Sequence, residues 1–115
     1  MDIVVHRCTV KLVDNVSATS DYQTEAFNIQ NFSLFCIQVE WDNVTYAGTL
    51  PLVDIFGSNT LDGRYVSLRA ATVINGTNAT LINIEKAGYG FIKIVYKANG
   101  ALTGTFSANI NAKVV

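Results

Sequence analysis

The chain has 115 residues, of which 50 % are hydrophobic and only 15 % are charged, and its formal net charge is −1. Since soluble domains average roughly 25 % charged residues, this composition argues against a disordered acidic or basic segment. Eight Lys and Arg residues against nine Asp and Glu residues leave no basic surface for nucleic acid. No apolar run approaches the ~20 residues of a membrane-spanning helix, and residues 1–5 do not predict a signal peptide. We expect one domain over residues 1–115, with neither a membrane nor a nucleic acid as partner.

Apolar and polar side chains alternate with a period of two along most of the chain, which predicts β-strands. In chain order, the strand candidates are residues 4–12, 23–29, 35–41, 50–56, 65–68, 70–74, 80–85, 91–97 and 104–114. The last candidate is the clearest, because Phe106, Ala108 and Ile110 alternate with Ser107 and Asn109. Residues 64–74 contain neither Gly nor Pro and are also compatible with a short helix.

Turn signals separate these strand candidates. Asp-Gly at 62–63 and Asn-Gly at 75–76 and 99–100 supply the positive φ angles of tight hairpins. The single proline, Pro51, indicates that its strand begins there or lies at the edge of a sheet. About eight short strands separated by turns are typical of an antiparallel sandwich or barrel.

Three residues are assigned to the core. Trp41 shares one face of its strand with the apolar residues two, four and six positions before it, so we expect its ring to be buried. Cys8 and Cys36 each lie in an apolar stretch and fit neither a zinc site nor a disulfide framework. We expect two buried free thiols rather than a bridge, since free Cys is among the most buried residue types.

The sequence offers no catalytic constellation. Its one histidine, His6, lies on the apolar-rich face of the first strand candidate, and no activating motif surrounds it or Cys8. Glu40 and Asp42 are the residue types of a glycosidase pair or a calcium site, but beside a strand end they are more simply solvated acids. No nucleotide-binding or hydrolase motif is present. We therefore expect no enzymatic activity, no cofactor and no metal.

Three segments carry a family resemblance. They read IQVEW followed by GTL within 37–50, GSN followed by DGRYVSL within 57–68, and AGYGFIKIVY followed by TGTFSANINAK within 87–113. In this order they resemble small β-sandwich domains encoded in the structural modules of tailed bacteriophages. The match covers residues 32–113 and departs from the pattern at 51–56, which is lengthened.

The resemblance implies an all-β fold, a single antiparallel β-sandwich of about eight strands with jelly-roll-like or galactose-binding-like topology. It also implies a non-enzymatic virion protein that is assembled in the host cytoplasm. The expected role is a capsid-associated decoration or auxiliary protein that contacts the major capsid protein or another virion protein. A homo-oligomer, for instance a trimer, is compatible with this role. The alternative is a receptor- or carbohydrate-binding module of a head fibre or tail.

Each role predicts its own contact residues. For the capsid-associated role the candidate interface is Thr105, Asn109 and Asn111, because uncharged polar side chains on an outer strand face cost little to desolvate. For the binding module the candidate ligand contacts are the loop-adjacent aromatics Tyr22 and Tyr46, together with Tyr89. Stacking on a sugar requires exposed rings with polar groups nearby.

Overall fold

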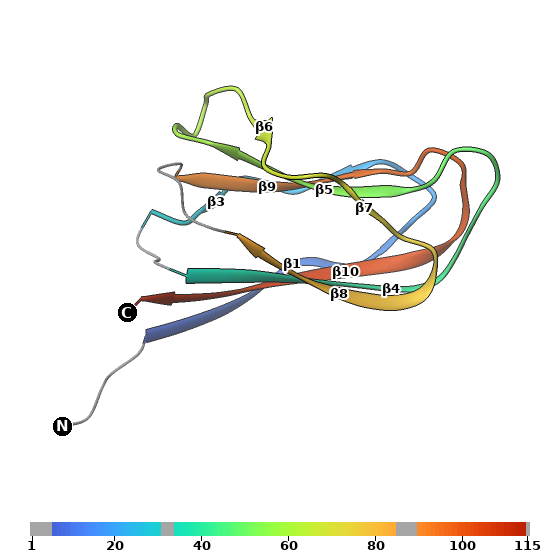
Figure 1. Ribbon diagram of the computed structural model, residues 1–115, viewed down its shortest axis with the longest axis horizontal. Helices are drawn as coiled ribbons and strands as arrows, with labels where there is room; N and C mark the ends of the chain where they lie inside the picture. Colours follow the sequence, from blue (N-terminus) through green and yellow to red (C-terminus); the bar gives the residue numbers. More distant parts are fainter. Residues whose placement is uncertain (1–5, 31–33, 85–89, 115) are drawn as a thin grey trace.

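The computed structural model describes residues 6–30, 34–84 and 90–114, which form ten β-strands and no helix. The strands are β1 (His6–Ser17), β2 (Tyr22–Gln23), β3 (Phe27–Asn28), β4 (Leu34–Tyr46), β5 (Leu52–Ser58), β6 (Val66–Ser67), β7 (Thr72–Val73), β8 (Gly76–Ile84), β9 (Phe91–Lys97) and β10 (Ala101–Val114). They build two sheets that pack face to face (Figure 1). None of the described residues belongs to a helix of the length and apolarity that would span a membrane.

The strand order is that of a jelly roll. One sheet has the order β1-β10-β4-β8, and the other follows β2-β9-β5-β6, with β3 also on β9 and β7 also on β5. All of these pairs are antiparallel. When β2 with β3, and β6 with β7, are each counted as one interrupted strand, eight strands form two sheets of four with two Greek keys. The expected antiparallel sandwich of about eight strands is confirmed, and its connectivity is that of a jelly roll.

Side-chain hydrogen bonds interrupt the two broken strands. Between β2 and β3, the hydroxyl of Thr24 accepts from the backbone amide of Ile94 at 3.0 Å, in place of a backbone carbonyl. After β6, the Ser67 hydroxyl donates to Arg69 O at 2.7 Å, a local bond of the kind that competes with a ladder. The ladder to β5 resumes at β7, where Thr72 pairs with Val53, and just beyond it Ile74 N donates to Pro51 O at 3.2 Å. Residues 64–74 therefore form two short strands on β5 and not a helix.

The core lies between the sheets and is built from the inward positions of four long strands. Along β10, Phe106, Ala108, Ile110 and Ala112 are buried, and the residues between them are half-buried. β4, β5 and β9 show the same alternation. Trp41 is 6 % exposed, which confirms its expected place in the core. Its indole N–H donates to Asn75 O at 3.0 Å, so the polar atom of the ring is satisfied.

Pro51 and Cys36 show how position within a sheet decides burial. Pro51 is buried and directly precedes β5, which lies between β9 and the interrupted strand β6–β7. This proline therefore begins an interior strand.

Cys36 is a free thiol, but it is only half-buried, and the expectation of a buried thiol is wrong for it. Its neighbours Phe35 and Ile37 take the inward positions of β4, so alternation turns Cys36 outward. Cys8 lies in β1, and its side chain is outside the described residues.

An aromatic cluster closes one end of the core. The rings of Tyr96 and Phe106 have centroids 4.5 Å apart, and Tyr22 meets Phe106 edge-on at 6.2 Å. The Tyr96 hydroxyl donates to Ala18 O at 2.7 Å, which ties the segment after β1 to the opposite sheet. Burial of the phenol, followed by the charge of Asp21, raises the pKa of Tyr96 to about 12.

Three residues with positive φ bend the four-stranded sheet where β1, β10 and β4 run together. They are Asn15 in β1 (φ 48°), Asn43 in β4 (φ 53°) and Gly104 in β10 (φ 111°). The pairing register shifts beside each of them, as in β-bulges. A Cβ on Gly104 would lie 2.7 Å from Val44 Cα, so this crossing point requires glycine.

We predict that Trp41→Ala lowers the free energy of unfolding by about 3–5 kcal/mol, because it removes a large buried ring and leaves a cavity. Chemical denaturation followed by circular dichroism measures the change. Leu102→Ala is the control, since Leu102 is 60 % exposed and its loss should stay within about 0.5 kcal/mol. Equal stability of Trp41→Ala and the wild type would contradict the assigned core.

We also predict that stability falls between pH 10 and pH 12. The pKa of Tyr96 is raised from 10.0 to about 12 on folding, so the unfolded chain loses this proton first. The contribution of the neutral phenol is complete below pH 10 and declines above it, by at most about 1.4 kcal/mol per pH unit. Denaturation at several pH values should show a shallower decline for Tyr96→Phe. Identical slopes for the two proteins would contradict the assignment.

Candidate functional site

The candidate interface residues lie in the middle of the four-stranded sheet, on the face turned away from the core. Thr105, Asn109 and Asn111 are half-buried outward residues of β10, and Ser107 completes their row. β10 lies between β1 and β4, so other strands flank the row on both sides. The structure thus brings the three expected residues together on one face.

Strand pairing places further side chains beside this row. Asn111 lies between Thr9 of β1 and Cys36 of β4, and Asn109 lies between Lys11 and Gln38. The next strand, β8, adds two exposed residues, Leu81 opposite Gln38 and Asn83 opposite Cys36. We call this surface the outer face. It comprises Thr9, Lys11, Ser17, Cys36, Gln38, Glu40, Asp42, Ala79, Leu81, Asn83, Thr105, Ser107, Asn109 and Asn111.

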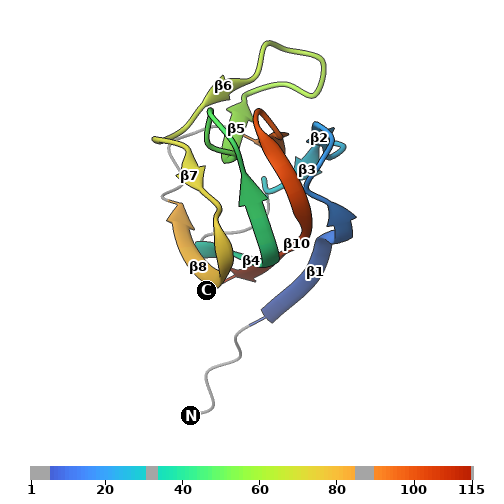
Figure 2. The same ribbon diagram turned by 90° about the vertical axis from the view of Figure 1, so that its right-hand side faces the viewer.

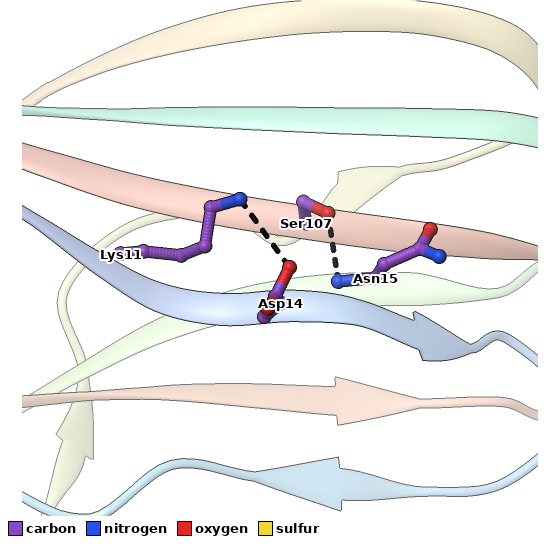
Figure 3. Close-up of polar contacts among 4 residues, drawn as sticks. All are labelled: Lys11, Asp14, Asn15 and Ser107. Atoms are coloured by element: carbon purple, nitrogen blue, oxygen red, sulfur yellow. Dashed lines mark hydrogen bonds and ion pairs between the residues drawn. The ribbon is translucent and has the colours of Figure 1, made fainter.

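Two charged residues of the outer face, Lys11 and Glu40, interact with neighbouring side chains. At the β1 edge, Lys11 Nζ lies 3.3 Å from Asp14 Oδ1, and both side chains are exposed. Beside this ion pair, the backbone amide of Asn15 donates to the Ser107 hydroxyl at 2.8 Å (Figure 3). On β4, the Gln38 amide donates to the Glu40 carboxylate at 3.0 Å. The row of Thr105, Ser107, Asn109 and Asn111 is therefore uncharged and polar, and the described charges Lys11, Glu40 and Asp42 lie on the two flanking strands.

The aromatic residues expected to contact a ligand are placed differently. Tyr22 is half-buried and turns one edge to the core ring of Phe106, whereas Tyr46 is 36 % exposed at the end of β4. Among the described residues, no ring contact joins Tyr22 to Tyr46. Tyr89 lies outside the described residues.

A hollow of about 320 Å³ opens beside Tyr22, between β1 and the segment that carries β2 and β3. Its lining consists of Lys11, Leu12, Tyr22, Thr24, Glu25, Ala26 and Phe27. This volume is at the lower end of the range of small-ligand sites. An aromatic ring, a cation and a carboxylate thus meet at one edge of the sandwich.

The two acids considered for chemistry are neighbours on the outward side of β4. Glu40 and Asp42 are exposed and oppose Ser107 and Thr105 in the ladder. Within residues 6–30, 34–84 and 90–114, no three His, Cys, Asp or Glu side chains gather as a metal site would require. The side chain of His6 is outside the described residues.

Cys36 and Leu81 are two of the outer-face residues that the sequence interpretation missed. Cys36 was assigned to the core, and Leu81 was placed in a strand candidate whose inward and outward sides were not predicted. The alternation of β4 already turned Gln38 and Glu40 outward, and the same period assigns Cys36 to their side. The register that brings Leu81 next to Gln38 joins residues 43 positions apart, and no local pattern specifies that pairing.

Proteins of known structure share this fold. The SPBc2 prophage-derived protein YomS superimposes with a TM-score of 0.69 at 10 % sequence identity, over 99 % of this chain and 98 % of its own. The chain from infectious bursal virus derived T=1 particles gives 0.60 at 12 % identity, and the VP2 subviral particle of infectious bursal disease virus gives 0.58 at 11 %. Each match covers 96 % of this chain and 32 % of the viral chain, so this chain spans about a third of those proteins.

No protein-family model matches the sequence, and the comparison with curated proteins yields no match. At identities of 10–12 % the likeness is one of fold. It confirms the fold that the resemblance implied: this chain has a β-sandwich fold that is also found in a prophage-derived protein and in chains of infectious bursal disease virus particles.

Proposed function

We propose that the protein is a non-enzymatic, capsid-associated decoration or auxiliary protein of a phage virion. It binds the major capsid protein or another virion protein, and it acts through contact area alone. One observation carries the proposal: the middle of the four-stranded sheet presents the outward row of Thr105, Ser107, Asn109 and Asn111, which is uncharged and half-buried. The fold shared with YomS and with viral particle chains supports a virion location.

The physical case rests on the cost of covering this row. A buried charge without a partner costs several kcal/mol, whereas Thr, Ser and Asn side chains can exchange water for a partner's polar groups. A soluble domain more often carries Lys and Glu at such positions. Short side chains on a pleated face also allow close approach over a broad area. The row is thus suited to contact with another protein surface.

Assembly on a lattice explains how so small a contact surface would suffice. Repeated subunits on a capsid multiply weak contacts into strong attachment. Binding to the folded capsid subunits then stabilises them by mass action. In this account the protein joins the virion during assembly in the host cytoplasm, where a homo-oligomer such as a trimer would add avidity.

We predict that Asn111→Lys weakens association with phage heads by about tenfold or more, because it buries an unpaired charge in the interface. The experiment incubates purified protein with heads that lack it, sediments the heads and counts the bound copies. Gln23→Lys is the matched control: it places the same charge on an exposed residue of the other sheet, where β2 pairs with β9.

The wild type should sediment with heads at a copy number that matches the lattice, as should Gln23→Lys. Circular dichroism should show that Asn111→Lys folds normally. Unchanged occupancy of Asn111→Lys would contradict the proposed interface. Failure of the wild type to bind any heads would contradict the capsid-associated role itself.

The second candidate function is a carbohydrate- or receptor-binding module of a head fibre or tail. The hollow beside Tyr22 favours it, because Thr24, Glu25 and Lys11 line the hollow together with this aromatic residue.

This role predicts that the protein binds sugars on a glycan array and that Glu25→Gln lowers the affinity by about tenfold or more. The substitution removes a charge-assisted hydrogen bond to the sugar at an exposed position. Gln23→Asn is the control, since Gln23 is exposed and outside the hollow. Absence of array binding would remove this candidate.

A further inference from the structure

The two sheets end in four edges, and three of these are protected against pairing with other strands. In the six-stranded sheet, the edges are formed by β2 with β3 and by β6 with β7, each only two residues long. In the four-stranded sheet, β1 is long but irregular, with register shifts between Lys11 and Val16. The exposed ion pair of Lys11 and Asp14 lies on the same edge. Short strands, charges and bulges are the features by which proteins block edge-to-edge association.

The fourth edge, β8, has none of these features from Asn78 onward, since its one register shift with β4 lies between Gly76 and Asn78. Its nine residues, Gly76–Ile84, contain neither a charged residue nor a proline. From Asn78 to Ile84 the strand keeps an unbroken register with β4. β4 is its only neighbour in the described sheet, and β8 lies along one side of the sandwich (Figure 2). Among the described residues, it is the one long edge that is both regular and uncharged.

The hydrogen bonding of Ala79 shows which backbone groups face outward. The Ala79 amide donates to the side chain of Asn78 at 2.8 Å, which implies that it points away from β4. In an antiparallel strand both polar groups of one residue face the same side, and successive residues alternate. Leu81 and Asn83 therefore also direct their backbone N–H and C=O groups toward the open side.

We propose that β8 pairs with β8 of a second copy, antiparallel and about a twofold axis at Leu81. The two Leu81 residues then face each other as a hydrogen-bonded pair, and Ala79 of each copy pairs with Asn83 of the other. The two four-stranded sheets become one continuous sheet of eight strands, and the outer faces of both copies lie side by side. The proposal is independent of the capsid-associated role, because it concerns only self-association.

A second copy fits this edge for two reasons. Twofold pairing places each residue opposite a residue of the same strand, and a strand without charges brings no like charges together. Leu81, at the centre of the pairing, is 65 % exposed. It would meet its own counterpart on the outer face, so the pairing covers the most exposed large apolar side chain among the described residues. Backbone bonds supply the remaining contacts, as in other strand additions.

Sedimentation equilibrium of the purified chain tests the proposal, with Leu81→Lys as the variant. Two lysines opposite each other on the axis should weaken dimerisation by about tenfold or more. Leu102→Lys is the matched control: Leu102 is 60 % exposed but belongs to β10. We expect the wild type and Leu102→Lys to form dimers and Leu81→Lys to remain monomeric.

A cross-linking variant covers the case in which Leu81→Lys fails to fold. Opposite residues of a hydrogen-bonded pair have Cα atoms about 5.5 Å apart, a separation that a disulfide can span. Under mild oxidation, Leu81→Cys should form a covalent dimer, whereas Leu102→Cys should not. Cys8 and Cys36 are present in both variants and in the wild type, so they contribute equally to any background.

A monomeric wild type at all soluble concentrations would overturn the proposal. So would equal dimerisation of Leu81→Lys and Leu102→Lys, or equal cross-linking of the two cysteine variants. A trimer unaffected by Leu81→Lys would show that another surface mediates assembly. Since none of these measurements uses phage heads, their outcome is separate from that of the head-binding experiment.

Discussion

The two-residue alternation of β10 is the constraint on which the rest of the molecule depends. β10 lies between β1 and β4, so each of its inward side chains meets the core and each outward one meets the outer face. Phe106 joins Tyr96 and Tyr22 inside the sandwich, while Asn109 and Asn111 are held outward by the same register. A shift by one residue would exchange the two sets. Core packing therefore fixes the candidate interface.

The bends around Gly104 keep that alternation compatible with a closed sandwich. Gly104, Asn15 and Asn43 all have positive φ, and they lie on three adjacent strands. Hydrogen bonds from side chains support the bend: the Thr103 hydroxyl donates to Asn43 O at 2.7 Å, and Asn43 N donates to Thr77 Oγ1 at 2.9 Å. Bulges of this kind increase local twist. The sheet thus curves over the aromatic cluster without losing its outer row.

Local sequence patterns predicted the parts of the fold that depend on local alternation. The strands at 91–97 and 104–114, and the burial of Trp41, follow from the period of two, because each inward position also has to be apolar. The interruption at Thr24 was not predictable in this way, since it depends on a hydrogen bond to Ile94 seventy residues later. Cys36 was misassigned because an apolar stretch was taken as buried on both faces, although only one face of the four-stranded sheet is covered.

The candidate site likewise has a part that local sequence patterns predict and a part that depends on long-range strand pairing. That Thr105, Asn109 and Asn111 lie on one face follows from their spacing in a strand. Cys36, Gln38 and Leu81 lie beside them only because β10 pairs with β4 and β4 pairs with β8. This pairing joins segments far apart in the sequence, so local patterns could not predict it. The aromatic residues illustrate the opposite case: Tyr22 and Tyr46 both lie near loops, yet only the structure shows that the ring of Tyr22 meets the core.

The central claim is that the outer face of the four-stranded sheet is the surface applied to the virion. Electron cryomicroscopy of phage heads saturated with the protein tests it most directly, because the orientation of a jelly roll can be determined from its two unequal sheets. We expect Asn109 and Asn111 to lie against a capsid subunit, with the six-stranded sheet toward solvent. A head-bound protein whose outer face is exposed to solvent, or whose six-stranded sheet contacts the capsid, would contradict the account.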